Sequence, residues 1–389
     1  MEKAKISVIQ LFFLMFMFEM GTALVIPYRI DAKKDAWLAI LLGMCVGFIP
    51  FFIYSFLFRQ YSNLPLTGYA KKVFGKYLGW IIGLLCIISF LYETAHQIRS
   101  FGELLLSWTL TETPLLAIII LFVLPICYVL YLGIEVLGRT AEVFIVFLLF
   151  MGFTGNFLVF LSGNFDIHNL QPFLENGWKP IVTTALLETS HFPFGQMAVF
   201  LMVLPYLNQP GLYKKVWLSA LISSGLALSY TISLNIAVLG VEKVERSTFP
   251  LLATIGKVNL FEFIQRLDAI VVFTMLITVF FKASIFFYCS LIGIVDLFKL
   301  KNHQQIILPI GCILIFWSII LSSNYAEHIE EGDYSICKEG IPCLLVVVYR
   351  GTRTRSADCE NNWLQSFCLQ SLPFFVERDI SSNRKRLIL

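Results

Sequence analysis

Residues 12–27 read FFLMFMFEMGTALVIP, an apolar stretch that is interrupted by a carboxylate at Glu19 and a glycine at Gly21. A second stretch, HFPFGQ at residues 191–196, places Pro193 inside another long apolar segment. A helix that stops within a bilayer leaves backbone N–H and carbonyl groups without partners, which is tolerated where they line a cavity. The two stretches therefore predict two membrane helices that are broken near the bilayer midplane.

The two interruptions lie five predicted helices apart, at corresponding points of two halves, residues 1–163 and 164 onward. Broken helices at matching positions of inverted repeats point to a substrate site at the midplane. Unpaired N–H groups suit a carboxylate and freed carbonyls suit an ammonium, so an α-amino acid fits both. The alternative is that Gly21 only permits close helix packing and Pro193 only kinks its helix.

The composition of the whole chain is that of a multi-pass membrane protein. Hydrophobic residues make up 58% of the 389 residues, charged residues 14%, and the mean hydropathy is +0.78. Soluble domains carry about 25% charged residues, so a soluble enzyme is excluded as an interpretation. The net charge of +3 is too small, and its basic residues too scattered, to indicate a nucleic-acid partner.

Nine segments are apolar over a length that crosses a bilayer, which takes about 20 helical residues. Five are free of charge, and four are interrupted by charged or helix-breaking residues. The first is read as a spanning helix and not as a cleaved signal peptide, because no small-residue cleavage site follows it. The nine segments are residues 6–28, 37–58, 80–108, 114–134, 143–163, 181–205, 216–241, 266–298 and 306–325.

The chain divides into a polytopic domain, residues 1–332, and an atypical tail, residues 333–389. The tail carries 14 charges and four cysteines in 57 residues, and its only apolar run is nine residues long. A replaced reading frame and a non-membrane appendage both produce such a change. Counting Lys and Arg on each side favours an N-terminus on the inside. Residues 246–267 are expected to lie along the interface as a short helical hairpin.

Charged side chains inside the predicted spans must face the protein interior and find partners there. Lys282 has 13 uncharged, mostly apolar residues on either side, so it is expected to be buried, bridging the first and eighth spans against Glu19 or Glu188. The third span carries four polar groups that are expected on one helical face. An internally paired ladder and a proton or ligand pathway both remain open for this set, which comprises Glu93, His96, Arg99 and Glu103.

The sequence contains no phosphate loop, metal-ligand cluster or nucleophile constellation. We therefore expect no enzyme activity, no cofactor and no metal. The cysteines within the apolar runs are expected to be small buried hydrophobes and not disulfide partners. They are Cys45, Cys86, Cys127, Cys289 and Cys312.

Several motifs together resemble the B-subunit family of spore germination proteins. They are FFLMFMFEMGTALVIP at 12–27, DAWLAILLG at 35–43, FPFGQMAVFLMVLPYL at 192–207, ERSTFPLL at 245–252, QRLDAIVV at 265–272 with FFKASIFFY at 280–288, and SSNYAEHIEE at 322–331. The resemblance covers about residues 4–331 in collinear order. The family supplies membrane subunits of nutrient-germinant receptors and is similar to amino acid/polyamine/organocation permeases.

This resemblance implies an all-α membrane protein with the ten-helix, five-plus-five inverted-repeat (LeuT-like) permease fold, in which helices one and six are broken. It implies a location in the spore inner membrane of an endospore-forming bacterium. The implied partners are an A-type membrane subunit, a C-type lipoprotein subunit and a small nutrient such as an amino acid. No cofactor is implied.

Carried onto this chain, the resemblance implies a nutrient pocket between helices one, three, six and eight. Backbone N–H groups at the first break would meet the carboxylate, and three aromatic side chains would set selectivity. The implied pocket residues are Gly21, Thr22, Tyr92, His96, Phe194, Gly195, Ser284 and Tyr288, and the accompanying buried charges are Glu19, Glu93, Arg99, Glu103, Glu188 and Lys282.

Two departures from the family pattern affect this interpretation. Gln196 stands where the family often has a carboxylate, so a proton-coupling or ammonium-pairing role at that position does not carry over. The tail replaces the expected tenth helix, which is therefore disrupted or divergent. We predict a receptor subunit that senses a nutrient and triggers germination, with a secondary amino acid transporter of the same fold as the alternative.

Overall fold

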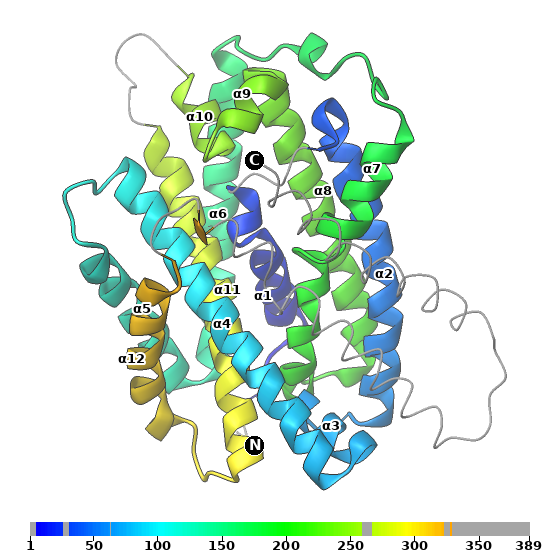
Figure 1. The fold of residues 1–389 in the computed structure, drawn as a ribbon, viewed down its shortest axis with the longest axis vertical. Coiled ribbons are helices and arrows are strands. Elements are labelled where there is room, and N and C mark those ends of the chain that lie inside the picture. Colours follow the sequence, from blue (N-terminus) through cyan, green and yellow to red (C-terminus); the bar gives the residue numbers. More distant parts are fainter. Residues whose placement is uncertain (1–4, 26–30, 63, 259–266, 323–326, 329–389) are drawn as a thin grey trace, which may run out of the picture. The chain divides into compact units, whose positions relative to one another are not determined.

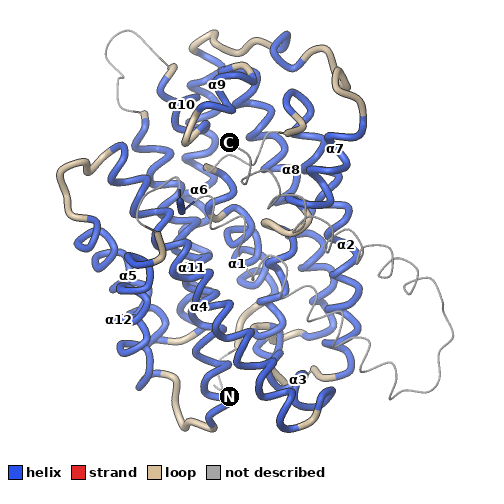
Figure 2. The backbone as a smooth tube through the Cα atoms, viewed as in Figure 1, coloured by secondary structure: helices blue, strands red, loops and turns tan. Residues whose placement is uncertain are grey.

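The structure is a computed structural model that describes residues 5–25, 31–62, 64–258, 267–322 and 327–328. All of these residues belong to one structural unit. The described residues form helices joined by loops, with no strand longer than a single bridge (Figure 2). The predicted tail and tenth helix lie outside them, so the division at residue 332 stays a prediction.

Among the described residues, six helices are long and apolar enough to cross a membrane, which makes this an integral membrane protein. They correspond to predicted spans two, three, four, five, seven and eight. They are α2 (Ala36–Gln60), α4 (Lys76–Trp108), α5 (Leu115–Leu132), α6 (Ile134–Leu161), α8 (Tyr213–Leu239) and α11 (Asp268–Phe298).

The remaining predicted spans are shorter or interrupted. The first is α1 (Val8–Met20) followed by a 3₁₀ turn, and the ninth is α12 (Gln304–Ile320). The sixth is divided into α7 (Trp178–Thr184), a π-helical turn and a 3₁₀ helix, Phe194–Met202. Both helices that the sequence predicts to be broken are therefore interrupted in the structure.

The connections are short helices. α3 (Leu66–Phe74) joins α2 to α4, and α9 (Val241–Arg246) and α10 (Pro250–Gly256) follow α8. The predicted interfacial hairpin at 246–267 is helical in α10, and its residues 259–266 lie outside the described residues.

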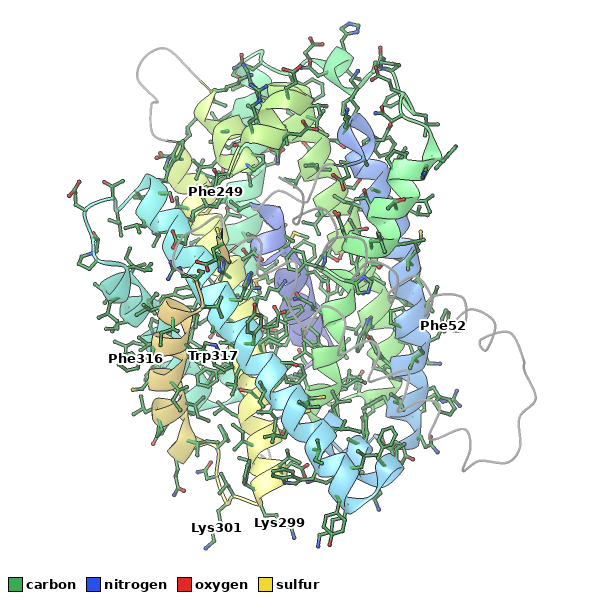
Figure 3. All side chains as sticks on the ribbon, viewed as in Figure 1. Phe52, Phe249, Lys299, Lys301, Phe316 and Trp317 are labelled. Carbon is green, nitrogen blue, oxygen red and sulfur yellow. The ribbon has the colours of Figure 1, made fainter. Side chains whose placement is uncertain are left out.

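In the view of Figure 1, α1 lies between α4 and α11 on one side and α8 and α2 on the other, and the long helices that pack against it are α8, α6 and α11. α11 is the most deeply buried of the six long helices, and α6 the least. Apolar side chains such as Phe52 of α2 and Phe316 of α12 point away from the other helices, as lipid-facing side chains do (Figure 3). α1 and the 3₁₀ helix Phe194–Met202 are largely buried, whereas α7 and the π-helical turn keep exposed apolar side chains such as Trp178 and Leu186.

Local sequence explains where α1 begins and ends. Ser7 and Gln10 form a reciprocal capping box, in which each side chain accepts a hydrogen bond from the other residue's N–H. The helix ends at Gly21, whose φ of +28° is a conformation that side-chain-bearing residues rarely adopt. The glycine at residue 21 thus ends the helix in mid-segment.

The far ends of the two broken segments are joined by backbone hydrogen bonds. The N–H of Ile6 donates to the carbonyl of Tyr206 at 2.9 Å, and the N–H of Asn208 donates to the carbonyl of Ile6 at 3.0 Å. Nearby, Asp296 at the end of α11 accepts hydrogen bonds from Thr67 at 2.7 Å and Lys71 at 2.9 Å of α3. These bonds join the start of the first segment to the end of the sixth, and α3 to the end of α11.

Gly79 permits the close crossing of α4 and α3, and this gives a stability prediction. A Cβ at residue 79 would lie 2.5 Å from the carbonyl oxygen of Ala70, a backbone atom that cannot rotate away. We expect Gly79→Ala to destabilise the fold by about 1–3 kcal/mol, the usual cost of overpacking. Thermal unfolding of purified protein measures this loss.

The matched control is Gly152→Ala on α6, because a Cβ there meets nothing within 4 Å. Alanine also has the higher helix propensity, so we expect this variant to unfold at the wild-type temperature or above. Equal melting temperatures for the two variants would contradict the packing role of Gly79.

Candidate binding site at the two helix breaks

Lys282 of α11 connects the two breaks. Its side chain is fully buried, and a Cβ at Gly21 would lie only 2.3 Å from its Cδ atom. Its Nζ lies 4.3 Å from the ring centroid of Phe192 at the second break and 5.2 Å from that of Phe18 in α1. Aromatic faces attract a cation at such distances. The ammonium is therefore held between the two interrupted segments.

Two carboxylates accompany this ammonium. Glu93 of α4 accepts a hydrogen bond of 3.0 Å from the Nε2 atom of Gln196, which lies just beyond the second break. Lys282 interacts electrostatically with Glu93 and, less strongly, with Glu19. All three charged side chains are buried. Side chains from α1, α4, α11 and the second break thus meet at one place.

The backbone of the first break is largely engaged by protein groups. The N–H of Gly21 donates to the carbonyl of Met17 at 3.0 Å, and the carbonyl of Gly21 accepts from the hydroxyl of Thr278 at 3.0 Å. In this conformation the Gly21 N–H is therefore not open to a ligand carboxylate, the role that the family resemblance implies for it. Thr22, the next residue, is buried beside it.

The second break depends on a glycine that allows a close backbone approach and on hydrogen-bonded turns at its start. A Cβ at Gly195 would lie 3.0 Å from the carbonyl oxygen of Ser190, so this close approach favours glycine. The carbonyl of Glu188 accepts hydrogen bonds from the N–H groups of His191 and Phe192. Phe194 is buried and faces Gly47 of α2, where a Cβ would lie 3.1 Å from its own Cβ.

The implied pocket residues of α11 lie on another face of that helix. Ser284 follows Lys282 by two residues, a rotation of about 200°. Tyr288 contacts the rings of Tyr206 and His303, each with a centroid separation of 6.1 Å. The structure does not bring Ser284 or Tyr288 to the ammonium of Lys282.

The polar residues of α4 are divided between two neighbours. Glu93 faces the second break, whereas Arg99 forms a 2.6 Å ion pair with Glu103 and donates to the carbonyl of Ile319 in α12. Residues 93 and 99 are six apart, about 120° around a helix, so they do not share one narrow face. The four residues were expected on a single face of the helix, but they lie on two. The predicted internal pairing is seen between Arg99 and Glu103.

Tyr92 and His96 also turn toward α12. The Tyr92 ring lies 6.3 Å from that of Trp317, and the His96 ring stacks at 4.1 Å on that of His328. Ser100 is within 2.8 Å of the Nε2 atom of His328.

The sequence-based interpretation missed three residues of the site. Phe18 and Phe192 supply the aromatic faces, and Thr278 bonds the Gly21 carbonyl. An aromatic residue directly beside each break was the available signal. Within the described part of the chain, no three His, Cys, Asp or Glu side chains are grouped to hold a metal ion.

Gln196 gives a testable prediction at this site. Gln196→Met keeps the side-chain size but removes the donor to Glu93, and a buried group left short of a partner costs about 1–3 kcal/mol. We expect a lower melting temperature. In the control Gln304→Met, which removes an exposed bond to the carbonyl of Tyr131, we expect little change. An equal shift for both would refute a special role for Gln196.

A comparison with known protein families now identifies the relatives of this chain. A family model described as "Spore germination protein" matches residues 5–326. The chain belongs to the spore germination protein family. The chain is 37% identical to spore germination protein KB of Bacillus subtilis (strain 168) over 332 residues, 85% of this chain and 89% of that protein. It is 27% identical to spore germination protein A2 of the same organism over 315 residues, 76% and 81% of the two chains.

Solved structures establish the fold. The crystal structure of MhsT in complex with L-phenylalanine superposes with a TM-score of 0.64 at 12% identity, covering 91% of this chain and 93% of that chain. Mhp1, a nucleobase-cation-symport-1 family transporter in a closed conformation with bromovinylhydantoin bound, gives 0.61 at 15% identity, covering 85% and 75%. This spore germination protein therefore has the LeuT-like transporter fold, as the resemblance implied.

Proposed function

We propose that this chain is the nutrient-binding membrane subunit of a germinant receptor in the spore inner membrane. It binds a small nutrient, such as an amino acid, at the two helix breaks, and binding triggers germination. The observation that carries the proposal is the convergence of buried Lys282, Glu93 and Glu19 on both breaks. Buried charges within membrane segments are costly and mark functional sites.

The proposed partners are an A-type membrane subunit and a C-type lipoprotein subunit. Family membership supports this assembly, because it is the B-type subunits of such receptors that the sequence motifs resemble. In the proposed mechanism the nutrient binds one of two conformations more tightly and increases its population, and the partner subunits respond to that conformation. Hydrogen bonds join Ile6 to Tyr206 and Asn208, so the two broken segments are linked at their far ends in the conformation described here.

A secondary amino acid transporter is the second candidate. The likeness to MhsT, which holds L-phenylalanine in its solved structure, favours it. Both candidates use a midplane site, so the site residues do not discriminate between them. Net flux of the nutrient across the membrane distinguishes a transporter from a receptor subunit.

The deciding experiment uses proteoliposomes that contain the full chain. Uptake of labelled amino acids, sugars and nucleosides is measured, with equilibrium binding on the same preparation. Saturable binding without flux supports the receptor subunit, and saturable flux supports the transporter. Folded protein that neither binds nor transports any of these nutrients contradicts both.

A further inference from the structure

Glu19 is a fully buried carboxylate without hydrogen-bond donors. Its relative exposure is 0%, and neither of its oxygens has a hydrogen-bond partner among the described residues. Buried polar groups in proteins are almost always hydrogen-bonded, so each exception requires an explanation. An ionised carboxylate in such a place either finds a cation or takes up a proton.

The position of Glu19 on α1 also disfavours a negative charge. It occupies the last turn of the helix, where the unpaired carbonyls and the helix dipole are negative. The same helix end favours a positive charge, and Lys282 supplies one beside Gly21. The α1 terminus thus stabilises the ammonium and destabilises an ionised Glu19.

The ammonium does not balance both carboxylates. Among the described residues, neither the Nζ of Lys282 nor the carboxylate oxygens of Glu19 have a hydrogen-bond partner, and the larger attraction of Lys282 is to Glu93. Glu93 also receives the hydrogen bond from Gln196. One lysine therefore accompanies two buried carboxylates, and Glu93 is the one with the better partners.

The other elements around α1 do not supply the missing charge. On α6, Phe144 contacts Phe281, the neighbour of Lys282, so this level of α6 is apolar. The charged residues of α6 lie nearer its start and are Glu135, Arg139 and Glu142. Those of α8 lie in its first turn and are Lys214 and Lys215. The titratable residues at the second break are Glu188 and His191.

We propose that Glu19 is a proton-binding site. It holds a proton in the conformation described here and exchanges it when the protein changes state, so nutrient binding is linked to pH. The linkage to the nutrient rests on the proposed function, whereas the bound proton does not. No covalent step is involved: the carboxylate gains or loses one proton, and the bulk solution is its source and acceptor.

The bound proton is tested by infrared spectroscopy of the purified full chain without ligand. At neutral pH we expect the carbonyl stretch of a protonated carboxylic acid. Glu19→Gln should remove this band, and Glu19→Asp should shift it. In the control Arg99→Met/Glu103→Gln, which removes the buried pair facing α12, the band should remain. A wild-type spectrum without the band, or a band that survives Glu19→Gln, overturns the proposal.

The linkage is tested by binding of the labelled nutrient panel between pH 6 and pH 8. Exchange of one proton changes the wild-type affinity by up to about tenfold per pH unit. Rising affinity with pH means that the ligand displaces the proton, and falling affinity means that binding takes it up. We expect Glu19→Gln to flatten this dependence, and a slope that is the same in both proteins overturns the linkage.

The two experiments separate the failure of this inference from that of the proposed function. If the wild type binds none of the panel, the proposed function fails, and the infrared band still decides whether Glu19 holds a proton. If the wild type binds a nutrient and the band is absent, the proposed function stands and the proton site is wrong.

Discussion

Gly21→Leu is expected to abolish the nutrient response while the protein still inserts into the membrane. Gly21 has a positive φ in a sparsely populated region that a leucine adopts only at a cost of about 1–3 kcal/mol, and its Cβ would lie 2.3 Å from Cδ of Lys282. The lysine stem fills the space, so the substitution must displace the ammonium that joins the two breaks. Germination of spores carrying the variant, with protein level measured in the membrane, tests this result.

The control separates backbone strain from the collision with Lys282. Gly163 also has a positive φ, +67°, but a Cβ there meets nothing within 4 Å. Gly163→Leu therefore imposes strain without displacing a buried group, and we expect the response to persist. A wild-type response of Gly21→Leu would contradict the proposed site, and loss in both variants would assign the effect to the backbone alone.

The positions of the helices were largely predictable from charge and hydropathy. Long uncharged runs identified the spans because a buried or lipid-facing helix excludes charge over its whole length. The start of α6 at Ile134 was not predictable in this way, because the helix begins nine residues before the uncharged run. Its first turns carry Glu135 and Arg139, which form an i,i+4 ion pair that is compatible with a helix at the membrane surface.

The site was less predictable, because the side of a buried helix that faces a given neighbour depends on how the helices pack together. Almost every side chain from Phe281 to Gly293 is buried, so hydrophobicity does not show which of them faces α1. The sequence identified Lys282 by its charge, but the choice of Ser284 rested on resemblance and lies about 200° away. Only the packing of α11 against Gly21 and Phe192 shows which face meets the breaks.

Lys282→Met is expected to destabilise the protein by about 3–5 kcal/mol, the cost of removing one partner from a buried charge pair. Methionine fills nearly the same volume, so the loss reports charge and not packing. Glu93 would lose the ammonium to which it is attracted. A large fall in the melting temperature of purified protein, with reduced abundance in the membrane, is the measured result.

A lysine outside the interior provides the matched control. Lys71 pairs with Asp296 at 2.9 Å, but both side chains are about 30% exposed, and ion pairs of this kind contribute about 1 kcal/mol or less. Lys71→Met should therefore cost much less than Lys282→Met. Equal losses would mean that Lys282 is solvated and not part of a buried network.

Second substitutions identify the carboxylate that depends on Lys282. If Glu93 is the ionised partner, Glu93→Gln added to Lys282→Met removes the unbalanced charge and restores much of the lost stability. Glu19→Gln added to Lys282→Met should restore little, because a protonated Glu19 carries no charge to balance. Rescue by Glu19→Gln and not by Glu93→Gln would reverse the assignment and make Glu19 the ionised partner. The pair of double variants thus tests the charge state of the site without any knowledge of the nutrient.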